Sequence, residues 1–297
     1  MTRILAIANQ KGGVGKTTTA INLGASLHAL HQNVLIVDLD PQAYATFGLG
    51  FRKTSTHRGI GSVFQNRQDI HQITQAVYPA SPYSFDICPV SASFGTETQV
   101  LKKHPEYLHV LYEYSDYDYI IIDTPPALNF LTYAALLTAT ECIMPVQAEF
   151  WAFVAINRFL NFFSTAHKQN LELRFEGILL TMVDDTAQYC REIVSQAEDT
   201  VPSNCLISTQ IPRDIRFSES QSHHKCILDY SPESKGSLAY MQCAREILVR
   251  HHKLPSMGAP APNRSGHINA NGTLQFNPSG ESTQNISPIL KFKDKIK

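Results

Sequence analysis

A glycine-rich segment near the start of the chain contains the residue types that bind phosphate groups. An apolar run, 4–8, leads into Asn9-Gln10-Lys11-Gly12-Gly13-Val14-Gly15-Lys16-Thr17-Thr18-Thr19. Glycines let backbone N–H groups turn toward phosphate oxygens, and the helix that follows adds the partial positive charge of its N-terminus. Lys16 can reach the β and γ oxygens, and the hydroxyl of Thr17 can bind Mg²⁺. The pattern predicts a site for nucleotide phosphates that comprises Gly12, Gly13, Val14, Gly15, Lys16, Thr17 and Thr18.

Two other segments place carboxylates at the ends of apolar runs. Asp38 and Asp40 follow the run 34–37, and the alternation of side chains along a strand would put both on one side, where they can address metal or water. Asp123 ends the run 119–122. A carboxylate there can accept a hydrogen bond from a magnesium-bound water or from a hydroxyl of the glycine loop. Taken alone, either segment could also be a simple cap, but together with the loop they predict one magnesium-nucleotide site.

Short apolar runs alternate with amphipathic segments through residues 1–250. The runs are mostly aliphatic and bounded by polar or turn residues, which is typical of buried strands. This alternation favours parallel strands joined by right-handed crossovers, so we predict an α/β fold with a doubly wound, mostly parallel sheet flanked by helices. The expected strands are Ile4–Ala8, Val34–Val37, Tyr119–Ile122, Cys142–Val146 and Gly177–Met182, and the expected helices are Thr17–Leu30, Trp151–His167, Ala187–Asp199 and Glu233–Arg250.

The composition changes after residue 250. Pro, Gly, Ser and Asn supply 19 of the 47 residues from 251 to 297, and such a segment buries too little apolar surface to offset its ordering entropy. We therefore predict one domain, residues 1–250, followed by a disordered basic tail, residues 251–297. The tail has a formal charge of +4 and the domain of −5, so any contact with nucleic acid must be local.

The three motifs together resemble the deviant Walker A ATPases, the family that includes the ParA/Soj partition proteins and the MinD cell-division regulators. Gln10 stands where the usual first glycine would be, and Lys11 is the additional early lysine of this family. The resemblance implies a P-loop NTPase fold, ATP and Mg²⁺ as ligands, and a homodimer in which Lys11 reaches the partner's ATP. It also implies that Asp40 positions the attacking water while Asp38 lies near the magnesium. From residue chemistry alone, Lys11 could instead be a solvated loop lysine.

Later segments favour the ParA/Soj branch. Residues 211–220 read IPRDIRFSES and are similar to the branch's I-P-R-N-V-R-x-S-E-A, and residues 230–240 are similar to its D-P-x-S-K-G-A-x-A-Y. The resemblance implies that Pro212 and Asp214 line the adenine pocket, although Asp214 replaces an asparagine that can both donate and accept. The implied site has Lys11, Lys16 and Asp40 as catalytic residues, Thr17 on the metal, and Lys11, Gly12, Gly13, Val14, Gly15, Lys16, Thr17, Thr18, Asp38, Asp123, Pro212 and Asp214 around the nucleotide.

Partition ATPases of this type bind DNA without sequence preference, which requires basic side chains that neutralise phosphates. The candidates are Arg213, Arg216, Lys225 and Lys235, which could equally be solvated or nucleotide-facing. Three positions depart from the branch's pattern. Thr186 stands where the family commonly has an arginine, Tyr44 replaces an asparagine, and His224 replaces a glycine, and these departures predict weaker DNA binding or a different cargo.

We accordingly expect a cytoplasmic, nucleoid-associated ATPase that segregates plasmid or chromosomal DNA. Its ATP-bound dimer would bind non-specific DNA and hydrolyse ATP slowly until a ParB-like protein stimulates it. A MinD-like membrane regulator is an alternative function, because Ile289, Phe292 and Ile296 would share one helix face. So short a helix would bury little apolar area. A nucleotide-gated module that positions a protein cluster is the other alternative. The six cysteines form no C-x-x-C pair, which gives no sign of a zinc site.

Overall fold

The computed structural model describes residues 2–52, 59–61, 75–77, 85–92, 94–149, 152–254, 266–268 and 274–276. Its centre is a sheet with the strand order β3-β4-β2-β5-β1-β6-β7-β8-β9. Six neighbouring strands, from β4 to β7, pair in parallel, and the edge strands β3, β8 and β9 pair antiparallel. The strands are β1 Arg3–Ile7, β2 Val34–Asp38, β3 Gln75–Val77, β4 Phe85–Cys88, β5 Tyr119–Asp123, β6 Glu141–Gln147, β7 Arg174–Thr181, β8 Gly266–Ile268 and β9 Leu274–Phe276.

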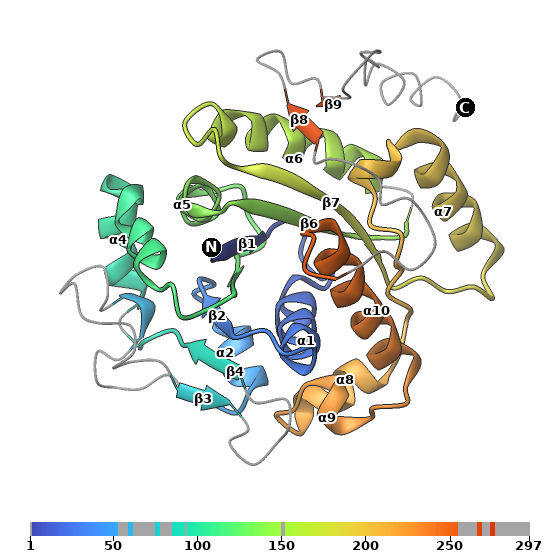
Figure 1. The fold of residues 1–297 in the computed structure, drawn as a ribbon, viewed down its shortest axis with the longest axis horizontal. Helices are drawn as coiled ribbons and strands as arrows, with labels where there is room; N and C mark the ends of the chain where they lie inside the picture. The colour runs from blue at the N-terminus through green and yellow to red at the C-terminus, as the bar shows by residue number, and fades with distance from the viewer. Residues whose placement is uncertain are drawn as a thin grey trace.

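Helices cover both faces of this sheet, with α1 and α10 on one side and α5 and α6 on the other (Figure 1). The alternation of side chains along β1 explains the two layers, since Leu5 and Ile7 belong to the core beneath α1 and α10, and Ile4 and Ala6 to the core beneath α5 and α6. The helices are α1 Lys16–Ala29, α2 Tyr44–Gly48, α4 Phe94–Lys103, α5 Phe130–Thr138, α6 Ala152–His167, α7 Gln188–Thr200, α8 Arg216–Ser222, α9 Ile227–Tyr230 and α10 Lys235–Arg250, with 3₁₀ turns η2 Pro105–Glu113 and η3 Ser203–Cys205.

Helix α10 packs along α1 and contacts its first turn, directly after the glycine loop. Tyr240 of α10 is 1% exposed, and its hydroxyl lies 2.9 Å from the hydroxyl of Thr19 in α1. A buried hydroxyl pair that is satisfied in this way avoids the cost of an unpaired polar group. Ser234 caps α10 by accepting a hydrogen bond from the backbone N–H of Ser237, at 3.2 Å.

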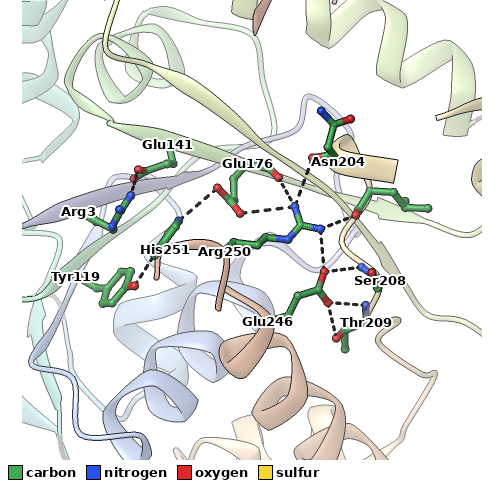
Figure 2. A network of polar contacts seen from close by, with 11 residues as sticks. Arg3, Tyr119, Glu141, Glu176, Asn204, Ser208, Thr209, Glu246, Arg250 and His251 are labelled. Atoms are coloured by element: carbon green, nitrogen blue, oxygen red, sulfur yellow. Dashed lines mark hydrogen bonds and ion pairs between the residues drawn. The ribbon is translucent and has the colours of Figure 1, made fainter. Parts of the chain in front are cut away.

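A network of buried polar side chains holds the carboxyl end of α10 against the amino ends of the strands (Figure 2). Arg250 donates hydrogen bonds to the carbonyl oxygens of Glu176, Asn204 and Leu206 and to the carboxylate of Glu246. The ring of His251 bridges the hydroxyl of Tyr119, at 2.9 Å, and the carboxylate of Glu176, at 3.3 Å. Glu246 also accepts from the backbone of Ser208 and Thr209. The network therefore joins α10, β5, β7 and the chain that follows η3.

The predicted α/β fold class is confirmed, and all five predicted strands and all four predicted helices are present within a few residues of their expected bounds. Trp151, the expected start of one helix, lies outside the described residues. Strand β4 and helix α5 were not predicted. Of residues 251–297 the structure describes 251–254 and the two short strands β8 and β9, which were not expected in this segment. The rest, including 289–297, lies outside the described residues, so its disorder stays a prediction.

Candidate functional site

The glycine loop leaves the carboxyl end of β1 and turns directly into α1. Its shape is set by Asn9, whose side-chain amide donates to the carbonyl of Pro145 at 2.7 Å and whose Oδ1 accepts from the backbone N–H of Lys11 at 3.0 Å. Gly13 and Gly15 have φ values of 74° and 88°, a left-handed conformation that glycine adopts without steric cost. The loop thus presents the N-terminus of α1, with its unsatisfied N–H groups, to any anion above it.

A hydroxyl and a carboxylate, Thr17 in the first turn of α1 and Asp123 at the end of β5, lie against each other beside the glycine loop. The Thr17 hydroxyl donates to Oδ2 of Asp123 at 2.8 Å. The other carboxylate oxygen of Asp123 is buried and has no hydrogen-bond partner among the described residues. Burial raises the pKa of Asp123 well above its ordinary value, and a nearby cation would favour its ionised form. A hydroxyl beside an unpartnered buried acceptor fits Mg²⁺ and one of its waters.

Lys16 is the cation of the site itself. Its side chain is buried, and its Nζ donates to the carbonyl oxygen of Lys11 at 2.8 Å. Burial lowers the pKa of Lys16, while the charges of Asp123 and Asp40 act in the opposite direction. Phosphate oxygens placed here would replace the carbonyl as acceptors and stabilise the charged amine.

Asp38 and Asp40 have different surroundings. Strand β2 ends at Asp38, so Asp40 lies in the turn beyond it rather than on the same strand. Asp38 is fully buried and accepts from the backbone N–H of Asp40 and from both the N–H and hydroxyl of Thr46. Burial raises the pKa of Asp38 to about 6. Asp38 therefore shapes the loop, whereas Asp40 lines the cavity above the glycines.

Two adjoining cavities open beside the loop, and both are lined by Gly15, Thr18, Met182 and Gln221. The larger has a volume of about 490 Å³ and the smaller about 360 Å³. The larger is bordered by the glycine loop, and the smaller combines apolar side chains such as Ile211 and Phe217 with polar ones such as Arg213 and Asp214. The larger is also lined by Gly12, Gly13, Lys16, Thr17, Asp40, Tyr44, Phe47, Gly48, Pro126 and His224, and the smaller by Thr181, Ile211, Pro212, Arg213, Asp214, Ile215, Phe217, Ser218 and Tyr240.

Comparison with known proteins decides the family. Residues 2–175 match the family described as the AAA domain. The sporulation initiation inhibitor protein Soj of Bacillus subtilis (strain 168) is 36% identical over 258 residues, which cover 83% of this chain and 98% of that protein. The chromosome partitioning protein ParA of Myxococcus xanthus (strain DK1622) is 34% identical, with coverage of 84% and 88%. The chain belongs to the ParA/Soj family of ATPases.

Solved structures share the fold of this ParA/Soj family member. Cobyrinic acid a,c-diamide synthase from Mycobacterium smegmatis, with bound ADP and magnesium, aligns with a TM-score of 0.72 and 29% identity over 86% of this chain and 97% of that one. The septum site-determining protein MinD of Pyrococcus horikoshii OT3, complexed with Mg-ADP, aligns with a TM-score of 0.67 and 24% identity over 86% of this chain and all of that one. The latter likeness concerns the fold alone.

The early lysine of the ParA/Soj family forms an ion pair within its own subunit. The Nζ of Lys11 contacts the carboxylate of Glu149, just beyond β6. Both side chains are partly exposed, so the pair is screened by solvent and little energy holds it. For Lys11 to act on a partner's nucleotide, this pair has to open. Sequence reasoning did not assign a role to Glu149.

Asp214 uses both carboxylate oxygens to join two helices. Oδ1 accepts from the backbone N–H of Arg216, at the start of α8, and Oδ2 from that of Gly236, at the start of α10. An asparagine offers only one acceptor oxygen, so this pair of N–H groups suits the aspartate found in this ParA/Soj chain. Asp214 and Pro212 both line the smaller cavity. Their contact with adenine stays a prediction.

The four basic residues predicted to bind DNA are exposed, but their surroundings differ. Arg216 pairs with Asp214, and Lys225 with Asp229, each at 3.4 Å. Arg213 lines the smaller cavity, which is the nucleotide-facing alternative. Lys235 forms no ion pair with the part of the chain that the structure describes.

Several residues at the ParA/Soj site had no sequence signal that placed them there. Gln221 and His224 reach the larger cavity from the segment around α8, about two hundred residues after the glycine loop. Tyr44 and Phe47 of α2 form its rim and are 59% and 42% exposed. None of the described helices combines the length and apolar character needed to cross a bilayer.

Proposed function

We propose that this protein is an ATP-driven switch that binds DNA without sequence preference and segregates plasmid or chromosomal DNA. The observation that carries the proposal is the meeting of Lys16, Thr17 and Asp40 around one cavity, with Asp123 behind Thr17. Partition proteins are among the relatives of this chain.

When bound, Mg²⁺ would supply neutralisation of the phosphate charge. Thr17 would hold the metal, and Asp123 would accept a hydrogen bond from a water bound to it. Lys16 and the N-terminus of α1 hold the phosphate oxygens, and Pro212 lies beside the base. Asp40 orients the attacking water, while Asp38 keeps the Asp40 loop in shape through Thr46.

ATP would bring two copies together with their cavities facing, so that Lys11 leaves Glu149 and reaches the partner's phosphates. The dimer would hold nucleoid DNA in the cytoplasm through Arg213, Arg216, Lys225 and Lys235. A ParB-like protein would then speed up an otherwise slow hydrolysis by bringing a basic residue near the phosphates, and hydrolysis would release the DNA.

Co-sedimentation with non-specific duplex DNA tests this function. The full chain is mixed with ATP, ADP or a slowly hydrolysed analogue over a series of salt concentrations. We expect binding that requires ATP, weakens steeply with salt and disappears in Lys16→Ala, because phosphate contacts dominate such binding. Binding in no nucleotide state would refute the proposal and direct the search to liposomes or protein assemblies.

A matched pair of variants tests the surface. Lys235→Ala removes a candidate contact, and Lys168→Ala removes an exposed lysine directly after α6 with the same change in charge. We expect only Lys235→Ala to weaken binding and to reduce the salt slope by about one phosphate contact. Equal effects of the two would indicate that net charge, and not this surface, governs binding.

A further inference from the structure

His224 occupies an unusual position in the wall of the larger cavity. It lies in the turn between α8 and α9, and its backbone has a φ of 56°, in the left-handed region that non-glycine residues seldom adopt. The ring Nδ1 is 3.0 Å from the carbonyl oxygen of Phe47 in α2. Because a carbonyl oxygen can only accept, Nδ1 must carry the proton. A side chain at a strained position thus makes one directed bond to another segment.

The segment that receives this bond also carries Asp40. The backbone N–H of Phe47 donates to the carbonyl of Ala43 at 2.9 Å, and that of Ala43 donates to the carbonyl of Asp40 at 2.8 Å. Ala43 is itself left-handed, with a φ of 59°. A continuous hydrogen-bonded path of eight residues therefore runs from Asp40 to Phe47, with His224 at its end.

Two further contacts hold the α8–α9 turn against its neighbours. A Cβ placed on Gly50, just after α2, would lie 3.1 Å from the Cβ of His224, so the two backbones approach closely. One turn before His224, the side-chain amide of Gln221 donates to the hydroxyl of Thr18 in α1 at 3.3 Å. The α8–α9 turn is thus anchored to α1, and the anchored turn holds α2.

We propose that His224 is a positioning residue for hydrolysis, which holds α2 and thereby the Asp40 loop in place through the carbonyl of Phe47. The inference rests on the proposed role of Asp40 in hydrolysis. Rigid support of this kind matters because a catalytic group has to be placed within a fraction of an ångström to orient a water. His224 does not itself need to touch the phosphates.

Three substitutions separate the bond from the backbone strain. In His224→Asn the amide nitrogen takes the place of Nδ1, and asparagine tolerates the left-handed conformation. His224→Gly also relaxes the backbone but lacks the donor. His224→Gln carries its amide one bond further out and keeps the backbone strain. Only the asparagine variant should therefore keep the bond to Phe47.

Two readouts on the full chain test the proposal. The first is hydrogen–deuterium exchange of the amides of residues 40–50, which we expect to accelerate about two- to tenfold in the glycine and glutamine variants, but not in the asparagine variant. The second is steady-state ATP hydrolysis, in which kcat should fall about two- to tenfold in those two variants while KM for ATP changes less than about twofold.

The proposal is wrong if the glycine variant exchanges and hydrolyses like the wild type, or if asparagine and glutamine behave alike. It is also wrong if the loss lies in KM, since that would make His224 a nucleotide contact. Asp40→Ala is the control for the underlying mechanism. If Asp40→Ala keeps the wild-type kcat, the proposed role of Asp40 fails, whereas the exchange experiment still reports on the bond from His224.

Discussion

Arg250 is the residue whose loss should damage the domain most without touching the nucleotide site. Its side chain is 9% exposed, and its guanidinium donates to three backbone carbonyls and to Glu246, with Glu176 at 3.7 Å (Figure 2). Arg250→Met keeps most of the apolar stem and removes every donor. The buried carboxylate of Glu176, the half-buried carboxylate of Glu246 and three carbonyls then lose a partner, and breaking a buried ion pair costs about 3–5 kcal/mol.

The expected consequence is a lower melting temperature. In a domain of this size each kcal/mol shifts Tm by about 2–4 °C, so Arg250→Met should melt about 6–20 °C lower. Urea unfolding followed by circular dichroism gives the free energy of unfolding, and calorimetry gives Tm. ATP binding measured at low temperature should change little, because the network lies at the amino ends of the strands and the nucleotide cavities at the carboxyl ends.

Arg245→Met is the matched control, since Arg245 lies on the same helix, is exposed, and has no ion pair among the residues described for this chain. It should change the free energy of unfolding by no more than about 0.5 kcal/mol. A loss below about 1 kcal/mol for Arg250→Met, or equal losses for the two variants, would refute the reasoning that buried, multiply bonded guanidinium groups stabilise this end of α10.

Three further predictions concern the site and its support. Thr17→Ala should abolish magnesium-dependent ATP hydrolysis while leaving the melting temperature of the free protein within a few degrees, because it removes a proposed metal ligand but little packing; an ATPase assay over a Mg²⁺ series checks this, and wild-type activity would contradict it. Burial raises the pKa of Asp123 and a bound cation would lower it, so Mg-ATP affinity should rise with pH through the range in which Asp123 titrates, and calorimetry in buffers of different ionisation enthalpy should detect proton release within that range. Binding without proton release would contradict that assignment. Gly236→Ala should destabilise the domain by about 1–3 kcal/mol, because the new Cβ would lie 2.6 Å from Phe217 and 2.7 Å from Ile227; unfolding in urea measures the loss, and a neutral effect would show that this packing can adjust.

The central strands were predictable because each is an unbroken aliphatic run with a clear polar boundary. Strand β4 lacks that signal, since Asp86 interrupts it, and only the structure shows that this carboxylate accepts a hydrogen bond from Tyr117. Helix α5 was missed for the opposite reason. It is buried on nearly all sides, so it has no polar face to reveal a helical period.

The predicted site residues differ in how directly the sequence could place them. The glycine loop could be predicted from consecutive residues alone, and Asp123 could be predicted from its position at the end of an apolar strand. Gln221 and His224 reach the cavity because α8 and α9 are bonded directly to α1, where Gln221 donates to Thr18 and the backbone N–H of Ile227 donates to Asn22. Nor could the sequence show that the carboxylate of Asp38 accepts hydrogen bonds from the N–H and the hydroxyl of Thr46, because these contacts depend on the turn after β2.

The parallel strands place the two cavities at one edge of the sheet, where the strands end, and the chain that follows α10 at the opposite edge, where the strands begin. The chain runs from the smaller cavity, at Tyr240 of α10, to the amino edge of the sheet, where the Nζ of Lys253 lies 2.8 Å from the carboxylate of Asp118. The described chain therefore reaches residue 254 at the edge of the sheet opposite the two cavities. If two copies join through their cavities, the two chains would reach residue 254 at opposite outer ends of the dimer. Shortening the chain after β9, which ends at Phe276, should therefore leave ATP-dependent pairing intact.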